Sequence, residues 1–227
     1  MSRTYSPWAR LVMGIFVVLA WAGIIEAQAN RVPKSDNQSW NDLQIAIPVT
    51  KKVDLTLQLT GRFGDNVTQI ADLRYGVGAV FRLNKYLSFN PFYFRREARP
   101  PNGRHESEDR LTLGTTIRIP VGKFTVSDRH WFEHRWREPQ INAWRYRNKL
   151  QIEHPFTIEK KKFTWILSDE VFYDWSLHVW PRNRVGAGIS HPFNKHLTVE
   201  LYYTRQNDGR TRPGDLNIIW SVWRVRL

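Results

Sequence analysis

Polar and apolar residues alternate with a period of two through nearly all of the chain beyond residue 30. In Val53–Thr60 the odd positions are apolar and the even positions polar, and the same parity holds in Leu73–Arg82 and Arg110–Ile119. Strict alternation gives a strand with one apolar and one polar face. Most of these runs reach ten to thirteen residues, about twice the length of a typical soluble strand. About ten residues of tilted strand cross a bilayer, so the pattern predicts membrane-spanning β-strands.

The composition excludes several other classes of protein. A mean hydropathy of −0.51 excludes a bundle of apolar membrane helices. The chain contains 11 Trp, 8 Tyr and 12 Phe, which is more aromatic surface than a disordered chain carries. It has no cysteine, which excludes disulfides, cysteine-bound zinc and thiol catalysis. We find no pattern of metal ligands and expect no cofactor.

The N-terminus has the three parts of a secretory signal peptide. Arg3 and Arg10 precede the apolar run Leu11–Ile25, and Ala27-Gln28-Ala29 then forms a small-residue cleavage site. A run of 15 apolar residues is short for a membrane span. We therefore expect residues 1–29 to be removed on export.

A repeat of 35 and 37 residues divides the rest of the chain. Pro48, Leu83, Pro120, Pro155 and Pro192 recur at these spacings near strand ends, and each period accommodates one up-and-down hairpin. Short turns that carry lysine alternate with longer connections rich in Arg, Pro and Gly. This asymmetry is typical of an outer-membrane barrel, in which the short turns are periplasmic and the longer loops extracellular.

The strand count leaves two alternatives. Six descending strands end near residues 49, 83, 121, 156, 193 and 227, whereas five ascending strands begin near 53, 86, 124, 163 and 197. Eleven strands would pair the first and last in parallel, and bacterial single-chain barrels have even numbers. We predict an all-β fold, a single transmembrane antiparallel up-and-down β-barrel of eleven or twelve strands over residues 40–227, with twelve favoured. Residues 30–39 then form the twelfth strand, or a segment in the lumen or over a rim.

Aromatic residues gather where the predicted strands meet their connections. Two such groups flanking an aliphatic band match the two interfaces of a bilayer. The predicted interface aromatics are Tyr86, Phe124 and Phe163 beside the short turns, and Trp136, Trp144 and Trp175 toward the longer loops.

Several short stretches resemble a known family. They include Gln38–Asp42, Tyr146–Leu150, Asp169–Tyr173 and Tyr202–Asp208, and together they are similar to bacterial outer-membrane proteins grouped as domain of unknown function 2490. The resemblance implies a barrel in the outer membrane of a diderm bacterium. It implies no established activity, so no catalytic residue is carried over.

The polar faces must point into the lumen if the apolar faces meet lipid. The lumen-facing charges predicted in this way are Arg62, Arg74, Arg110, Arg118, Arg129, Glu133, Arg135, Glu153, Arg184 and Glu200. A turn centred near residue 159.5 sets residues opposite each other when their numbers add to about 319. Arg145 then lies opposite Asp174, and Arg147 lies diagonal to Glu170 and Asp174. We predict that these four residues form an ion-pair cluster near the longer loops.

The excess of arginine allows two functions. Arginines and carboxylates can interdigitate and brace the wall, which makes the protein a structural component of the membrane. Alternatively, the surplus arginines can line a small pore that prefers anions. The chain carries a formal charge of +13, but the basic residues form no long run. We therefore expect no nucleic-acid partner, and we expect contacts with membrane lipid, with lipopolysaccharide phosphates and with the barrel-assembly machinery during biogenesis.

An enzyme acting on membrane lipid is the remaining alternative. Such an enzyme needs a nucleophile, a base and an orienting group within hydrogen-bonding reach. Ser190 and His191 are adjacent and so point to opposite faces of one strand. His130 and His134 share the parity of Phe132, which favours a place in an aromatic band over catalysis. We therefore expect no catalytic residue.

Overall fold

The computed structural model describes residues 33–99 and 105–227, and β-strands are the regular elements in this part of the chain. No helix among the described residues is long and apolar enough to cross a membrane. The expected signal peptide, residues 1–29, lies outside the described residues.

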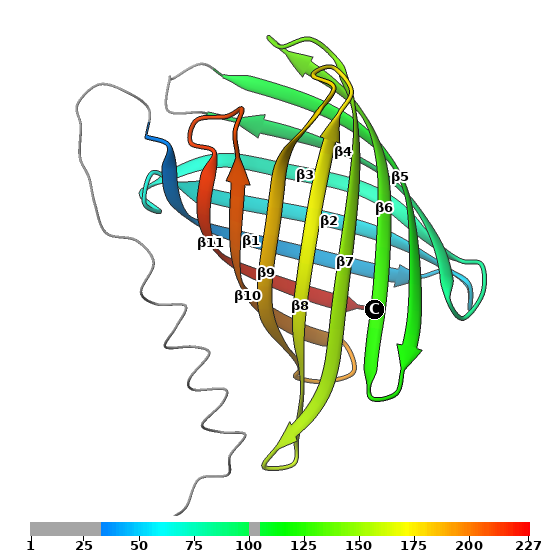
Figure 1. Ribbon diagram of the computed structural model, residues 1–227. Helices are drawn as coiled ribbons and strands as arrows, with labels where there is room; N and C mark the ends of the chain where they lie inside the picture. The colour runs from blue at the N-terminus through cyan, green and yellow to red at the C-terminus, as the bar shows by residue number, and fades with distance from the viewer. Residues whose placement is uncertain (1–32, 100–104) are drawn as a thin grey trace, which may run out of the picture. The chain divides into compact units, whose positions relative to one another are not determined.

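Eleven strands are formed by the described residues, and Figure 1 labels them along the chain. They are β1 (Ser35–Pro48), β2 (Val53–Gly64), β3 (Gln69–Arg82), β4 (Leu87–Ala98), β5 (Glu106–Val121), β6 (Phe124–Glu138), β7 (Ala143–Ile158), β8 (Lys161–Asp174), β9 (Val179–Pro192), β10 (Leu197–Asp208) and β11 (Asp215–Arg226). Each has 12 to 16 residues, so most are longer than the predicted runs and all exceed the roughly ten residues that cross a bilayer.

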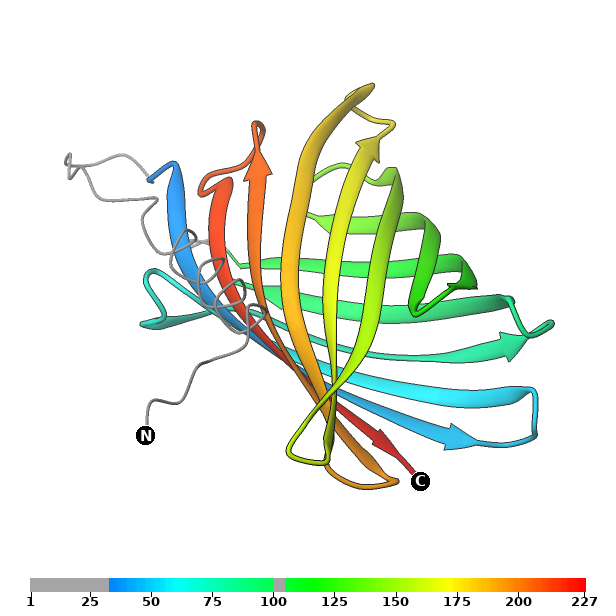
Figure 2. The same ribbon diagram turned by 60° about the horizontal axis from the view of Figure 1, so that its bottom comes forward.

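The strands close into one barrel by pairing in chain order. All sequential neighbours are antiparallel, and the barrel closes where β1 pairs with β11 in parallel, from Ser35 opposite Asp215 to Ala46 opposite Arg226. Figure 2 shows the arrowheads of these two strands pointing the same way. The predicted all-β barrel is confirmed, and its strand number is eleven rather than the favoured twelve.

The missing twelfth strand has a simple cause. Ser35–Ser39, which the sequence left as a possible separate segment, is the first part of β1 and continues directly into Trp40. No turn separates the two parts, so β1 and β11 run in the same direction. A parallel ladder is only slightly less stable than an antiparallel one, so this pairing can close the barrel.

The two ends of the barrel differ in their connections. At the short-turn end, the segments 49–52, 83–86, 122–123, 159–160 and 193–196 join the strands. At the loop end, the connections are 65–68, 99–105, 139–142, 175–178 and 209–214. The connections at the short-turn end have two to four residues, and those at the loop end have four to seven. The predicted asymmetry in connection length is therefore present but modest.

The two faces of the wall follow the predicted parity. On β2 the outward Leu55, Leu57 and Leu59 are exposed, whereas the inward Asp54 and Thr60 are buried. The buried apolar residues lie inside the barrel, where Trp40, Leu216 and Ile218 form one cluster and Ile166, Tyr202 and Val222 a second. Trp220 packs against both clusters, so the apolar core of this barrel lies mainly along the wall that contains the parallel pair.

Candidate functional site: the charged lumen

The inward side chains surround a cavity of about 1480 Å³. Its lining comes from all eleven strands of the described part of the chain, and it extends from Asp65 and Arg212 at the loop end to Lys195 and His196 at the short-turn end. Nineteen of the lining residues are Arg or Lys and nine are Asp or Glu. The surface of the cavity therefore carries more basic than acidic side chains.

One buried carboxylate joins three arginines. Glu133 on β6 is fully buried. Its oxygens lie 3.2 Å from the guanidinium of Arg110 on β5, 2.6 Å from that of Arg145 and 3.0 Å from that of Arg147, both on β7. Arginine presents several N–H donors in a fixed fork, so one carboxylate can hold three neighbours in defined positions.

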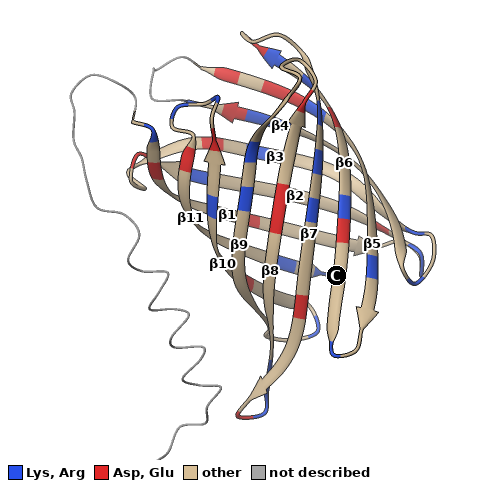
Figure 3. Ribbon diagram, in the orientation of Figure 1, with Lys and Arg blue, Asp and Glu red and all other residues tan. Residues whose placement is uncertain are grey.

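Two further carboxylates extend this network along the wall. Glu108 on β5 pairs with Arg110 and lies 2.7 Å from Arg135 on β6. Glu170 on β8 lies 2.6 Å from Arg147 and 2.7 Å from Arg129, and 3.6 Å from Arg184 on β9. Figure 3 shows basic segments on β7 and β9 beside an acidic one on β8. Ion pairs thus connect five consecutive strands, β5 to β9.

Arg145, Arg147 and Glu170 of the predicted cluster belong to this network, and Asp174 joins it only through Arg135, at 3.9 Å. Arg145 lies directly opposite Asp174, as the turn geometry requires, and Arg147 bonds Glu170. However, Arg145 bonds Glu133, which is its register partner on the other side. The register between β8 and β9 shifts between Phe172 and Asp174, and Asp174 accepts a hydrogen bond from the backbone N–H of Ser176 at 2.9 Å.

The other predicted lumen-facing charges lie inside the barrel in smaller groups. Asp72 on β3 lies 2.7 Å from Arg74, 3.1 Å from Arg96 and 3.8 Å from Arg62. Toward the short-turn end, Arg118 lies 2.5 Å from Glu153 and Arg224 lies 2.8 Å from Glu200. Arg110, Arg129, Glu133, Arg135 and Arg184 belong to the β5–β9 network described above. Every one of the ten predicted residues therefore contributes its side chain to the lumen.

Aromatic rings in the lumen were missed by the sequence interpretation. The guanidinium of Arg62 lies 3.4 Å from the ring centre of Trp40, and that of Arg184 lies 4.8 Å from the same ring. Phe172 is surrounded by the guanidinium groups of Arg145, Arg147, Arg182 and Arg184, at 4.8 to 5.5 Å. Such contacts favour arginine in a partly desolvated site. Trp40 and Phe172 are even-numbered, like the inward charged residues of their strands. The alternation therefore already indicated that both rings point into the lumen.

Glycine makes room for one of the inward rings. A Cβ atom at Gly188 on β9 would collide with the ring of Tyr202, its register partner on β10. The ring of Tyr202 therefore lies close to the backbone of Gly188, and its hydroxyl donates a hydrogen bond to Glu200 at 2.7 Å. This arrangement keeps Tyr202 in the wall lining.

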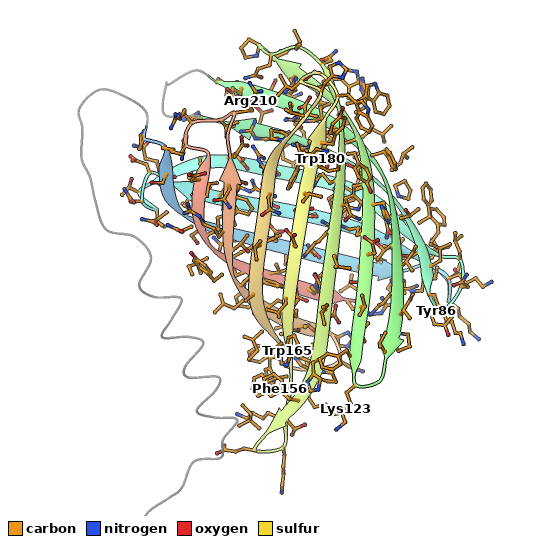
Figure 4. The ribbon with its side chains drawn as sticks, in the orientation of Figure 1. Tyr86, Lys123, Phe156, Trp165, Trp180 and Arg210 are labelled. Carbon is orange, nitrogen blue, oxygen red and sulfur yellow. The ribbon has the colours of Figure 1, made fainter. Side chains whose placement is uncertain are left out.

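The six predicted interface aromatics lie near the two ends of the strands. Tyr86, Phe124 and Phe163 are near the short-turn end, and Trp136, Trp144 and Trp175 are near the loop end. Five of them are exposed. Figure 4 labels Tyr86, Phe156 and Trp165 toward one end of the barrel and Trp180 toward the other. Their placement at bilayer interfaces stays a prediction.

The fold and the alternation of the faces define a β-barrel of the outer-membrane type. The chain belongs to the family described as "Protein of unknown function (DUF2490)", which matches residues 37–217. The family resemblance drawn from the sequence is thus confirmed. No curated protein matches the chain in sequence.

Solved structures share the fold at low sequence identity. The β domain of the Bordetella autotransporter BrkA is 10% identical, with 78% of this chain and 82% of that chain covered and a TM-score of 0.51. The NanC porin is 9% identical, with 80% of this chain and 93% of that chain covered and a TM-score of 0.51. At these identities the likeness is one of fold alone.

Proposed function

We propose that the protein is a structural outer-membrane β-barrel whose lumenal ion pairs brace the wall. Glu133 and its three arginines carry this proposal, because the group is buried and joins three strands. Exposed aliphatic side chains such as Leu57 on the outer face support the membrane location. Arg210, which Figure 4 labels at the loop end, is suited to contact lipopolysaccharide phosphates there.

Replacement of the central carboxylate tests the bracing. Glu133→Gln keeps the shape of the side chain but leaves three guanidinium groups with one less buried counter-charge. Loss of one partner from a buried ion pair costs about 3–5 kcal/mol. The free energy of unfolding from lipid vesicles, followed by tryptophan fluorescence, should fall by an amount in this range.

A partly exposed carboxylate provides the control. Glu97 pairs with Arg95 at 2.5 Å on the outer face near the loop end, and exposed pairs contribute about 0–1 kcal/mol. Glu97→Gln should therefore change the stability little. If Glu133→Gln is no more destabilising than Glu97→Gln, the network does not brace the barrel.

Passage of small anions is a second candidate function. It is favoured by one specific observation, the cavity whose lining reaches both ends of the barrel with 19 basic and nine acidic residues. Carboxylates of the network neutralise part of this charge, and the remaining guanidinium groups give the lumen a positive potential. Basic rings of this kind select anions in other pores.

Ion currents across planar bilayers test the second candidate. In a chloride salt gradient, the purified protein should give a reversal potential of the sign that anion preference requires. Arg118 and Arg224 lie toward the short-turn end with about half of their side-chain surface exposed, so Arg118→Gln together with Arg224→Gln should weaken the preference. Lys123→Gln, in a turn outside the cavity lining, should leave it unchanged. The absence of currents above the lipid background would remove this candidate and leave the bracing function intact.

A further inference from the structure

The outer face of β6, β7 and β8 carries a hydrogen-bonded polar group. On β6, the Nε2 of His130 lies 3.1 Å from a carboxylate oxygen of Asp128. Asn148 on β7 donates to the same carboxylate at 2.5 Å, and the hydroxyl of Tyr146 lies 2.6 Å from Nδ1 of His130. These side chains belong to the outward parity of their strands, so they face lipid rather than the lumen.

A second polar pair lies on the same face. Asp169 on β8 accepts a hydrogen bond of 2.5 Å from the side-chain amide of Asn183 on β9. Asp128 is the register partner of Leu150 on β7, and Leu150 is the register partner of Asp169. The two carboxylates are therefore two strand spacings apart, about 10 Å, with Leu150 between them.

Both groups lie midway along their strands. His130 is six residues from Phe124 at the short-turn end and six from Trp136 at the loop end, and Asp169 is likewise six residues from Phe163 and from Trp175. Six residues of strand span about 20 Å. Because these aromatics mark the expected interfaces, His130 and Asp169 lie at the same depth near the centre of the lipid-facing band.

Acyl chains alone cannot satisfy groups at this depth. Ionisable residues that face hydrocarbon are costly, and their presence marks a functional surface. The corresponding outward positions of β2 are Leu55, Leu57 and Leu59, and the outward pair midway along β1 and β11, Asn41 and Ser221, is uncharged. Asp128 and Asp169 instead place carboxylates at this depth on β6 and β8. Lipid headgroups lie at the level of the aromatic bands, too far away to pair with these carboxylates. A second membrane-spanning protein surface can bring polar groups to the centre.

The polar face is complementary to a copy of itself. A two-fold axis along the membrane normal through β7 places β6 of one copy against β8 of the other, because an isologous interface exchanges its two sides. His130 and Asp169 lie at equal depth, so the Asp128–His130 pair of each copy faces the Asp169–Asn183 pair of the other. The Asn183 amide has a second N–H besides the one bonded to Asp169, and the Asp128 carboxylate has free lone pairs. The amide of one copy can therefore donate to the carboxylate of the other, and this contact occurs twice.

We propose that the outer face of β6–β8 is an interface that binds a second copy of this chain. Aromatic side chains surround the polar centre toward the loop end, where Trp136, Trp144 and Trp175 are exposed. Aromatic residues are enriched in the energetically important parts of protein interfaces. The interface goes beyond the proposed lumenal function, because it uses the opposite face of the wall.

Cysteine cross-linking tests the interface, since the chain has no cysteine of its own. Leu150 lies next to the inferred axis, and Leu57 on β2 is matched to it, with exposed fractions of 46% and 43%. In native membranes, a bismaleimide cross-linker that spans about 10 Å should join Leu150→Cys into a dimer, because packed sheet faces lie about 10 Å apart and Leu150 lies next to the axis. Leu57→Cys should stay monomeric. The interface is refuted if Leu150→Cys does not cross-link, or if both variants cross-link equally.

Removal of the polar centre provides an independent test. In the Leu150→Cys chain, Asp169→Leu should lower the cross-linked fraction at least severalfold, whereas Ser221→Leu, on the outer face of β11, should not. Gel migration without boiling verifies that each variant has folded. A folded protein that remains monomeric in lipid nanodiscs, with tightly bound lipid that is lost in Asp169→Leu, would assign this face to a lipid and overturn the proposal.

Discussion

At the scale of single residues, the carboxylates of the lumen are shared between several arginines, and Arg147 is shared between two carboxylates. Arg147 lies 2.6 Å from Glu170 and 3.0 Å from Glu133, and Glu170 in turn keeps Arg129 at 2.7 Å. Loss of Arg147 therefore leaves both of its carboxylates with other arginines. This sharing spreads the cost of any single substitution over several strands.

A double-mutant cycle measures the direct Arg147–Glu170 interaction. Arg147→Ala should destabilise the folded barrel, and addition of Glu170→Ala should cost less than the sum of the two single changes, because the second removes a carboxylate already short of one partner. Contacting residues typically give coupling of about 0.5–3 kcal/mol. The cycle requires equilibrium unfolding of the four proteins from the same vesicles.

A distant pair is the matched control for this cycle. Arg147 and Arg224 pair with different carboxylates, Glu170 and Glu200 respectively. Arg147→Ala combined with Arg224→Ala should therefore be additive within about 0.5 kcal/mol. Strict additivity of the Arg147 and Glu170 changes would mean that their contact contributes no stability.

At the scale of the strands, the alternation assigns each side chain to lipid or lumen. Leu57 is outward and exposed on β2, and its neighbour Thr56 is inward and lines the cavity. Leu57→Arg should lower the free energy of unfolding by about 2–4 kcal/mol if residue 57 lies near the bilayer midplane. Thr56→Arg should cost much less, because water and carboxylates are available in the lumen.

The same unfolding measurement decides the assignment of the two faces. Leu55→Arg, on the same outward face of β2 and nearer the short-turn end, should cost less than Leu57→Arg, since the penalty falls toward the interfaces. Equal tolerance of arginine at residues 56 and 57 would mean that the faces are wrongly assigned.

Alternation predicted the strands well, and it failed where both faces of a strand are polar. At the start of β1, the inward Asp36 and Gln38 alternate with the outward Asn37 and Ser39, so no period was visible and the strand number stayed open. Asn37 accepts a hydrogen bond of 3.0 Å from Asn217 across the parallel pair. The polar outward residues are thus explained by contacts between the first and last strands, which only the closed barrel brings together.

The lumenal partners of the arginines were predictable only within a hairpin. The β7–β8 turn sets Arg145 opposite Asp174, and counting along the sequence predicted this register. The contact of Arg145 with Glu133 depends on the preceding hairpin as well, and the register shift near Asp174 has no signal in the alternation. Sequence parity therefore identified which side chains share the lumen but not which of them bond.

At the scale of the whole molecule, closure depends on contacts that cross the parallel β1–β11 pair. Trp40 on β1 is 1% exposed and packs with Leu216 and Ile218 of β11. Its ring also lies against the guanidinium groups of Arg62 on β2 and Arg184 on β9. The Trp40 side chain thus contacts β2, β9 and β11 and links the first strand of the barrel to the last.

Removal of this side chain should therefore weaken the closed barrel more than loss of an outer tryptophan. Trp40→Ala leaves a cavity and two unstacked guanidinium groups, and large-to-small changes of buried aromatics cost about 3–5 kcal/mol. Trp144, on the outer face, is 54% exposed, so Trp144→Ala should cost clearly less. Refolding into vesicles, followed by migration of unboiled samples in gels, compares the folded fractions.

Equal folded fractions and equal unfolding free energies for the two variants would show that Trp40 does not hold the parallel pair together. A selective loss for Trp40→Ala would mean that closure relies on lumenal packing in addition to the backbone ladder.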